Sequence, residues 1–395
     1  LTKNPSGKKD FVIKFRDQKN TGAHTGMKTQ YLSAEEREKG IQSYLTFAAF
    51  NGLGFSFLGD TPIYLMAIHF GASNTQIGYL SSALQVSGLI LLFLPRLLAG
   101  KNIIKVQFIA WLARGIVCSL YGVLLFVTGQ TAVAIILIVY TLFCLLRTFG
   151  VAMDPPVQQM LTTPSTTGEL IVGASNRGQW TRLLSLISSF LLLSLKELAE
   201  ITGLLVLQVL GIIFNTSGAL YLRRIPCREV VEYRHGRNLL VIFTESLKNR
   251  ERMLTLCVQW LTLSVSIIFG FIVPFLRKIV NFPYNLVFLY TMLGSLATIA
   301  AGYFLKPFVD RIGSKPMLIM ASFLSAAVAL IWSLLPPSIS WIVVFGLGFV
   351  TAFFQTIIGL LVSRLVLRSI PTRSKIGYTA MLNFFSAIIS LVVGL

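Results

Sequence analysis

Four charged residues lie within apolar stretches of this sequence, where a charge is costly. They are Asp60, Arg114, Arg147 and Asp154. A charged side chain at the centre of a membrane helix costs ~2.5–3.5 kcal/mol on insertion scales, so it usually faces a cavity or an opposite charge. A carboxylate can carry a proton, and a guanidinium can bind an anionic group through several hydrogen bonds. These four residues are therefore the first candidates for a site that binds a small solute or a coupling ion.

Arg147 and Asp154 are seven residues apart. At about 100° per residue they share nearly the same helix face, roughly 10 Å apart along the axis. They can line one cavity, but they cannot easily pair directly. Arg114 allows two interpretations: it contacts a bound solute, or it neutralises Asp154 across helices as a structural ion pair. The sequence leaves both open.

Asp60 precedes Thr61 and Pro62 in the first apolar stretch. Proline frees a backbone carbonyl and favours a kink, which membrane proteins use to shape binding sites. Because burial favours the protonated form of a carboxylic acid, Asp60 is the first candidate for proton coupling. The alternative is an interfacial aspartate that caps the end of the helix.

Uncharged polar residues in the apolar stretches complete the candidate cavity. They are Asn51, Gln85, Gln259, Gln355 and Asn383. Each of them can instead form a hydrogen bond between helices. The three histidines and four cysteines show no spacing typical of metal ligands, and no Ser/His/Asp set can be assembled from peripheral histidines. We therefore expect no metal, no cofactor and no enzymatic activity.

The composition indicates an all-α integral membrane protein. Hydrophobic residues make up 54% and charged residues 12% of the chain, with a mean hydropathy of +0.74, against roughly 45–50% and 25% in soluble domains. Eleven stretches can each supply the ~20 residues that a bilayer-spanning helix needs. They are residues 43–68, 76–95, 103–128, 132–160, 178–198, 201–222, 253–276, 284–305, 316–335, 340–363 and 376–395.

The basic residues predict the orientation of these stretches. Of the thirty-four Lys and Arg, only Lys196, Arg277 and Lys278 fall on the connections of one side, and two, Arg114 and Arg147, lie within spans. The other twenty-nine lie in the N-terminal tail or on the opposite connections. Cytoplasmic loops retain Lys and Arg, so the N-terminus is predicted to be cytoplasmic. This topology also explains the formal charge of +19, and we expect no nucleic-acid partner.

Four segments follow from this pattern. Residues 1–40 form a disordered basic cytoplasmic tail, and 41–222 form an N-terminal six-helix bundle. Residues 223–252 form a cytoplasmic linker, and 253–395 form an incomplete C-terminal bundle. The six-helix half is the repeat unit of many transporters, so we expect a twelfth helix beyond Leu395. The alternative is an eleven-span chain whose C-terminus lies outside.

A short polar loop follows the eighth stretch, with the sequence Asp310-Arg311-Ile312-Gly313-Ser314-Lys315. Gly313 suits a tight turn between antiparallel helices, and Asp310 can meet Arg311, Lys315 or a basic residue of a neighbouring helix. The pattern Asp-Arg-x-Gly-x-Lys resembles the signature cytoplasmic loop of the major facilitator superfamily. The matching loop of the first half, Pro95 to Asn102, lacks the acidic residue. Arg147-Thr148-Phe149-Gly150 and Ser175-Asn176-Arg177-Gly178 resemble further motifs of this family.

The resemblance implies two six-helix bundles related by a pseudo-two-fold axis. It also implies a proton-coupled secondary transporter that moves a small solute by alternating access, with the Asp310–Lys315 loop as a gate. Arg114 and Arg147 favour an organic anion as this solute. A monomer in the bacterial inner membrane, surrounded by lipid, is the expected form. The alternatives are a drug or lipid exporter of the same fold, or a non-transporting receptor or assembly factor.

Overall fold

The computed structural model describes residues 32–93, 100–162, 167–194, 200–227, 244, 247–336, 339–369 and 375–394. Four candidate side chains, those of Asp60, Asp310, Arg311 and Asn383, fall outside the described set, although their backbones lie in helices. Most of the predicted tail and of the predicted linker also lies outside it. Throughout the described ranges, the chain is helical and contains no strand, as the composition predicts.

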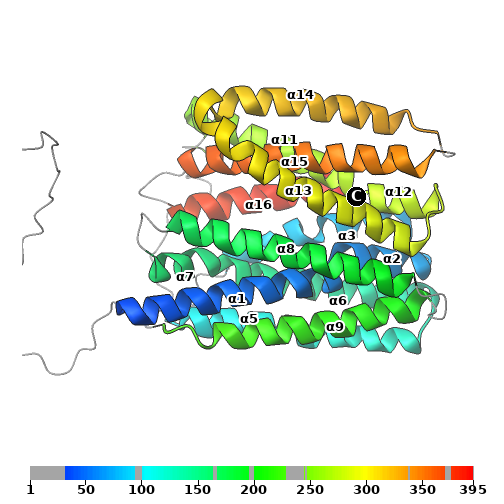
Figure 1. The fold of residues 1–395 in the computed structure, drawn as a ribbon, viewed down its shortest axis with the longest axis horizontal. Coiled ribbons are helices and arrows are strands. Elements are labelled where there is room, and N and C mark those ends of the chain that lie inside the picture. Colours follow the sequence, from blue (N-terminus) through cyan, green and yellow to red (C-terminus); the bar gives the residue numbers. More distant parts are fainter. Residues whose placement is uncertain are drawn as a thin grey trace, which may run out of the picture. The chain divides into compact units, whose positions relative to one another are not determined.

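Two sets of helices follow one another along the chain (Figure 1). We call the first set the first half: α1 Ala34–Leu58, α2 Asp60–His69, α3 Asn74–Val86, η1 Ser87–Leu92, α5 Ile103–Cys118, η2 Ser119–Leu125, α6 Gly129–Ala152, α7 Asp154–Leu161, α8 Thr167–Leu193 and α9 Glu200–Leu222. The second half contains α11 Arg250–Gly270, α12 Ile272–Lys278, α13 Tyr284–Ile312, α14 Ser314–Ser333, α15 Trp341–Ser369 and α16 Lys375–Gly394.

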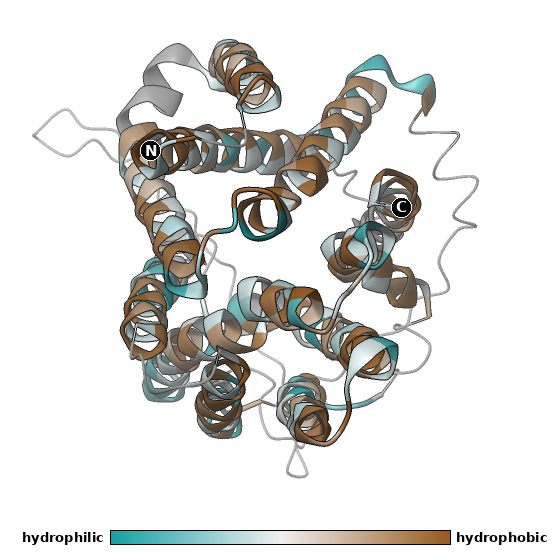
Figure 2. Cartoon of the chain, turned by 90° about the vertical axis from the view of Figure 1, so that its right-hand side faces the viewer, coloured by the Kyte–Doolittle hydropathy of each residue, from teal (hydrophilic) through white to brown (hydrophobic). Residues whose placement is uncertain are grey.

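Each of the eleven predicted stretches corresponds to one helix or to consecutive helices of this series. Among the described residues, seven of these units are long and apolar enough to cross a membrane: Ile103–Leu125, Gly129–Ala152, Ile201–Leu222, Arg250–Lys278, Tyr284–Leu305, Ser314–Ser333 and Trp341–Val366. Figure 2 views the helices from one end of the bundle and shows hydrophobic residues along all of them. The chain is thus an all-helical, multi-pass membrane protein.

Several stretches that are predicted to be single membrane spans form two consecutive helices in the structure. The first stretch breaks at Gly59, before Pro62, where the sequence predicts a kink. The fourth stretch, predicted as one helix, breaks at Met153, and α7 starts at Asp154 with two prolines in its first turn. Proline has no backbone N–H to donate, so it is tolerated in the first turn of a helix but not in its interior.

Two helix pairs form the most extensive packing between the halves, and α16 also packs on η1 and α12 on α2. Within the first half, α1 packs on α8 and α9; within the second, α15 packs on α13 and α14. Between the halves, α8 packs on α13 and α3 packs on α16. Large side chains within the helices, such as Ile138 of α6 and Phe323 of α14, are exposed on the surface, as expected for helices that face lipid tails.

The hydrophobic cores are shared at only one end of the bundle. We call this the α2–α3 end, because α2 meets α3 there. Its cluster combines buried residues of both halves, including Phe57 and Leu65 with Phe282 and Phe288. Toward the opposite end, the α13–α14 end, two separate clusters of described residues lie one in each half. The halves are therefore joined by a common core at the α2–α3 end.

Candidate solute-binding site

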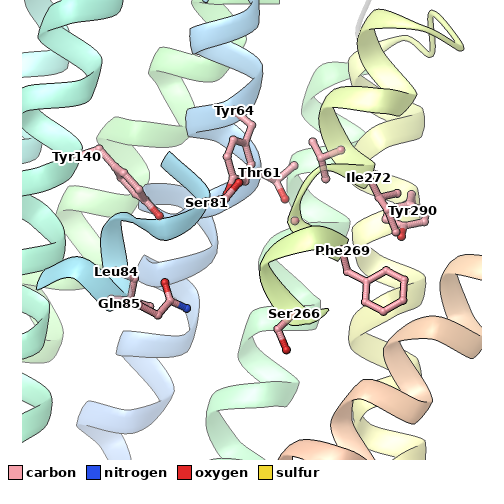
Figure 3. A pocket seen from close by; sticks show the side chains of 12 residues that line it. Thr61, Tyr64, Ser81, Leu84, Gln85, Tyr140, Ser266, Phe269, Ile272 and Tyr290 are labelled. Atoms are coloured by element: carbon pink, nitrogen blue, oxygen red, sulfur yellow. The ribbon is translucent and has the colours of Figure 1, made fainter. Parts of the chain in front are cut away.

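A cavity of about 260 Å³ lies between the two halves (Figure 3). This volume is close to the lower end of the roughly 300–1,000 Å³ range of ligand pockets. The residues that line it come from α2, α3 and α6 of the first half and from α11, α12 and α13 of the second: Thr61, Tyr64, Ser81, Leu84, Gln85, Tyr140, Ser266, Phe269, Gly270, Ile272, Val273 and Tyr290.

Broken helices from both halves meet at this cavity. The break between α1 and α2 at Gly59 precedes Thr61, and the break between α11 and α12 at Phe271 lies between lining residues Gly270 and Ile272. In each case a proline, Pro62 or Pro274, is the third residue of the second helix. Interrupted helices in corresponding positions of two halves are the structural sign of a transporter binding site.

Hydroxyl and amide groups supply the polarity of the cavity wall. The Tyr64 hydroxyl donates to Ser81 Oγ at 3.0 Å, and Thr61 and Thr291 share a hydrogen bond of 3.3 Å between the halves. Gln85 Oε1 is buried and has no hydrogen-bond partner among the described residues. Figure 3 shows the Gln85 side chain beside Leu84 at the cavity. Among the predicted polar residues whose side chains the structure describes, Gln85 is thus the one that lines the cavity directly.

Gln355 is connected to the cavity through one lining residue. Ser266 Oγ donates to Gln355 Oε1 at 3.3 Å, and Gln355 Nε2 donates to Ser325 Oγ at 2.9 Å. The amide of Gln355 therefore forms interhelical hydrogen bonds, which the sequence leaves open as an alternative. Gln259 is half-buried on α11 and is not among the lining residues.

Two guanidinium groups flank the ring of Phe55, toward the α13–α14 end of the cavity. Arg147 Cζ lies 4.4 Å from the ring centroid and Arg182 Cζ lies 5.8 Å from it. Phe55 and Arg182 also line a small void that shares Thr61 with the cavity. Sequence reasoning missed Arg182, because its place near a predicted span boundary made it look like one more cytoplasmic charge.

Arg114 is fully buried in the first half, where it ties three helices together. Its Nε donates to Asn215 Oδ1 of α9 at 2.9 Å, and its Nη2 donates to Asn51 Oδ1 of α1 at 2.9 Å and also to Asn215. The guanidinium stacks 3.8 Å from the centroid of Trp111. Arg114 and Asn51, both predicted to line a cavity, therefore bind each other away from the described cavity wall.

Asp154 has a separate set of partners. Its Oδ1 accepts hydrogen bonds from Gln107 Nε2 at 2.6 Å and from the Tyr44 hydroxyl at 3.2 Å. Gln158 Nε2 donates to the same Tyr44 hydroxyl at 2.8 Å. The predicted alternative in which Arg114 neutralises Asp154 is wrong, because Arg114 donates to two amide oxygens of other helices.

The predicted gating loop contains the expected turn. Gly313 has a φ of 91°, in the region that favours glycine, and directly precedes α14. Lys315 is exposed on the first turn of that helix. The side-chain contacts predicted for Asp310 and Arg311 lie outside the described residues.

No protein-family model matches this chain, and no curated protein sequence matches it. Solved structures match its fold. A variant of the nucleoside transporter NupG is 15% identical, with a TM-score of 0.68 over 90% of each chain. The xylose transporter XylE from E. coli, in a partially occluded inward-open conformation, is 14% identical, with a TM-score of 0.63 over 89% of this chain and 90% of that one.

A bacterial homologue of the human lysosomal transporter Spinster, in an inward-facing conformation, is 15% identical. Its TM-score is 0.61 over 92% of this chain and 82% of that one. At such low identity the likeness concerns the fold, and fold by itself does not define a substrate. With the loop from Asp310 to Lys315 and the two sets of helices, these matches give the chain the fold of major facilitator superfamily transporters.

Proposed function

We propose that this protein is a secondary transporter that moves a small solute across a membrane by alternating access. The observation that carries the proposal is the meeting of two broken helices, one from each half, at a polar cavity between the halves. Such a cavity can open to either side when the halves tilt about it. We further propose that residues 41–222 and 253–395 are the two bundles that tilt, joined by residues 223–252.

Contacts between the halves at the α2–α3 end support a state that is closed on that side. Lys278 Nζ donates to the Ala72 carbonyl at 2.7 Å and to Asn74 Oδ1 at 3.3 Å. The Tyr284 hydroxyl shares a 3.4 Å hydrogen bond with His69. If the N-terminus is cytoplasmic, in a bacterial inner membrane, these contacts close the outer side and the conformation faces inward.

At the same end, α3 and α16 approach each other closely, and this approach predicts the effect of a mutation. A Cβ atom added at Gly78 of α3 would overlap the backbone carbonyl of Gly394 of α16. We expect Gly78→Ala to weaken closure at the α2–α3 end, because a backbone atom cannot rotate away as a side chain can. A cysteine placed at Ser81 in the cavity should then react several-fold faster with an impermeant maleimide applied from that side.

Gly302→Ala is the matched control, because a Cβ added at Gly302 of α13 meets no atom within 4 Å. Its maleimide labelling should equal that of the parent protein. Equal labelling in Gly78→Ala as well would mean that the close approach of α3 and α16 does not limit opening.

We propose a proton as the coupling ion. Asp154 supports this, because its carboxylate accepts hydrogen bonds from neutral groups and makes no ion pair with any described residue. Asp60, which begins α2 beside the cavity residue Thr61, is the second candidate. A carboxyl group without a bound cation can gain and lose a proton without breaking a salt bridge.

A thermal-shift screen of the purified protein against metabolites at two pH values tests the proposal first, since a bound solute stabilises the folded state by mass action. Each solute that binds is then assayed for flux into proteoliposomes. We expect concentrative uptake driven by an imposed proton gradient. Binding without flux under any gradient would instead favour a receptor or assembly factor on this fold.

A further inference from the structure

Of the two intramembrane arginines singled out by the sequence, Arg147 has no polar partner among the described residues. It is half-buried on α6, and with the described residues it forms neither a hydrogen bond nor an ion pair. Its guanidinium lies over the ring of Phe55. Arg114 differs, because Asn51 and Asn215 accept hydrogen bonds from it. The two arginines therefore have different surroundings, and no described acceptor occupies the donors of Arg147.

The position of Arg147 relates it to the cavity. It follows the cavity residue Tyr140 by seven residues in the same helix, so both lie on nearly the same face, roughly 10 Å apart along the axis. Its ring partner Phe55 lines the small void that shares Thr61 with the cavity. Arg182 lies over the same ring, so two positive charges stand beside the α13–α14 end of the cavity.

The chemistry of this arrangement has two parts. Hydroxyl groups of Thr61, Tyr64 and Ser81, with the buried acceptor Gln85 Oε1, form a neutral polar wall. A guanidinium offers five donors in a planar fork that fits a carboxylate or a phosphate. Because Arg147 is partly shielded from bulk water, its fork should bind an anion more strongly than an exposed arginine would.

We propose that the solute is a hydroxylated organic anion, with its hydroxyl groups in the cavity and its carboxylate or phosphate on Arg147. This inference rests on the proposed transport function. The cavity volume of about 260 Å³ equals that of roughly nine water molecules in the liquid, which suits a body the size of a single sugar. The anionic group extends from this body toward the α13–α14 end.

The experiment compares three probes that share one pyranose ring: D-glucose, D-glucuronate and D-glucose 6-phosphate. Thermal shifts of the purified protein are recorded against concentration at constant ionic strength. We expect at least one anionic probe to bind roughly tenfold or more tightly than D-glucose, as a hydrogen-bonded charge pair would give. Comparing D-glucuronate with D-glucose 6-phosphate identifies which anionic group is preferred, and inorganic phosphate alone should bind more weakly than D-glucose 6-phosphate.

Arg147→Gln should abolish this preference. Arg147→Lys keeps the charge but loses the planar fork, so it should reduce the preference for anionic probes several-fold. This variant replaces Arg147→Gln in the experiment if Arg147→Gln does not fold. Arg224→Gln is the matched control, because Arg224 also lies over an aromatic ring, with Cζ 4.7 Å from the centroid of Tyr221, but is exposed. It should leave the preference unchanged.

The outcomes separate the inference from the transport proposal. Equal binding of neutral and anionic probes, no binding of either anion, or a preference that survives Arg147→Gln would overturn the inference. Flux of a neutral solute that does not depend on Arg147 would support the transport proposal and overturn the inference about the substrate class. Arg147-dependent binding of an anion without any flux would overturn transport and keep the anion site.

Discussion

Replacing Arg114 with alanine is expected to destabilise the protein by roughly 3 kcal/mol or more, since a hydrogen bond to a charged group contributes ~1.5–3 kcal/mol. The side chain is fully buried and holds the amide oxygens of Asn51 and Asn215. Both acceptors would lose this donor, and α1, α5 and α9 would lose their common contact. The truncated side chain would also leave a void beside Trp111.

Thermal unfolding of the purified protein in detergent measures this effect. Arg224→Ala is the control, because Arg224 is exposed and an exposed substitution usually changes stability by no more than about 0.5 kcal/mol. A normal unfolding temperature for Arg114→Ala, combined with loss of solute binding, would contradict the structural role. Arg114 would then act on the solute, which is the other interpretation that the sequence allows.

The different surroundings of Arg114 and Arg147 show where sequence reasoning reaches its limit. Both are arginines within apolar stretches, and hydropathy marks both as costly. Their roles depend on which side chains of other helices meet them: two amide oxygens in one case and a phenylalanine ring in the other. These contacts between helices depend on helix rotation and packing, which the order of residues along one helix does not specify.

The helix breaks were predictable in part. Asp60 and Pro62 mark the kink between α1 and α2, and the structure breaks there. The equivalent break before Pro274 was missed, because a single apolar stretch runs through it without a charge. A proline at the same place in both halves was the available signal. This proline indicates a helix break only when the sequences of the two halves are compared.

Most of the cavity wall could not be identified from residue types. Gln85 stands out because an amide is rare in an apolar stretch, and it does line the cavity. Tyr64, Ser81 and Ser266 line it too, but hydroxyl groups are common in membrane helices, where they can bond to the backbone of the preceding turn. The Ser81 hydroxyl, for example, donates to the Ile77 carbonyl at 3.2 Å.

Replacing Asp154 with asparagine is expected to abolish proton-driven accumulation while leaving exchange of solute across the membrane largely intact. The side-chain oxygen of asparagine can still accept the hydrogen bonds from Gln107 and Tyr44 that Asp154 Oδ1 accepts. Packing at the junction of α6 and α7 should therefore persist. An amide cannot take up and release a proton in this pH range, so the tilting of the halves would no longer be linked to proton movement.

Proteoliposomes with an alkaline interior provide the measurement. The parent protein should accumulate the solute above its external concentration, whereas Asp154→Asn should only equilibrate it, with an exchange rate within about twofold of the parent, since that change preserves the neighbouring hydrogen bonds. Tyr44→Phe is the matched control, because it removes one donor to Asp154 but keeps the carboxylate, and it should still accumulate solute. Full accumulation by Asp154→Asn would exclude Asp154 as the coupling site and leave Asp60, at the start of α2, as the carboxylate to test in the same assay.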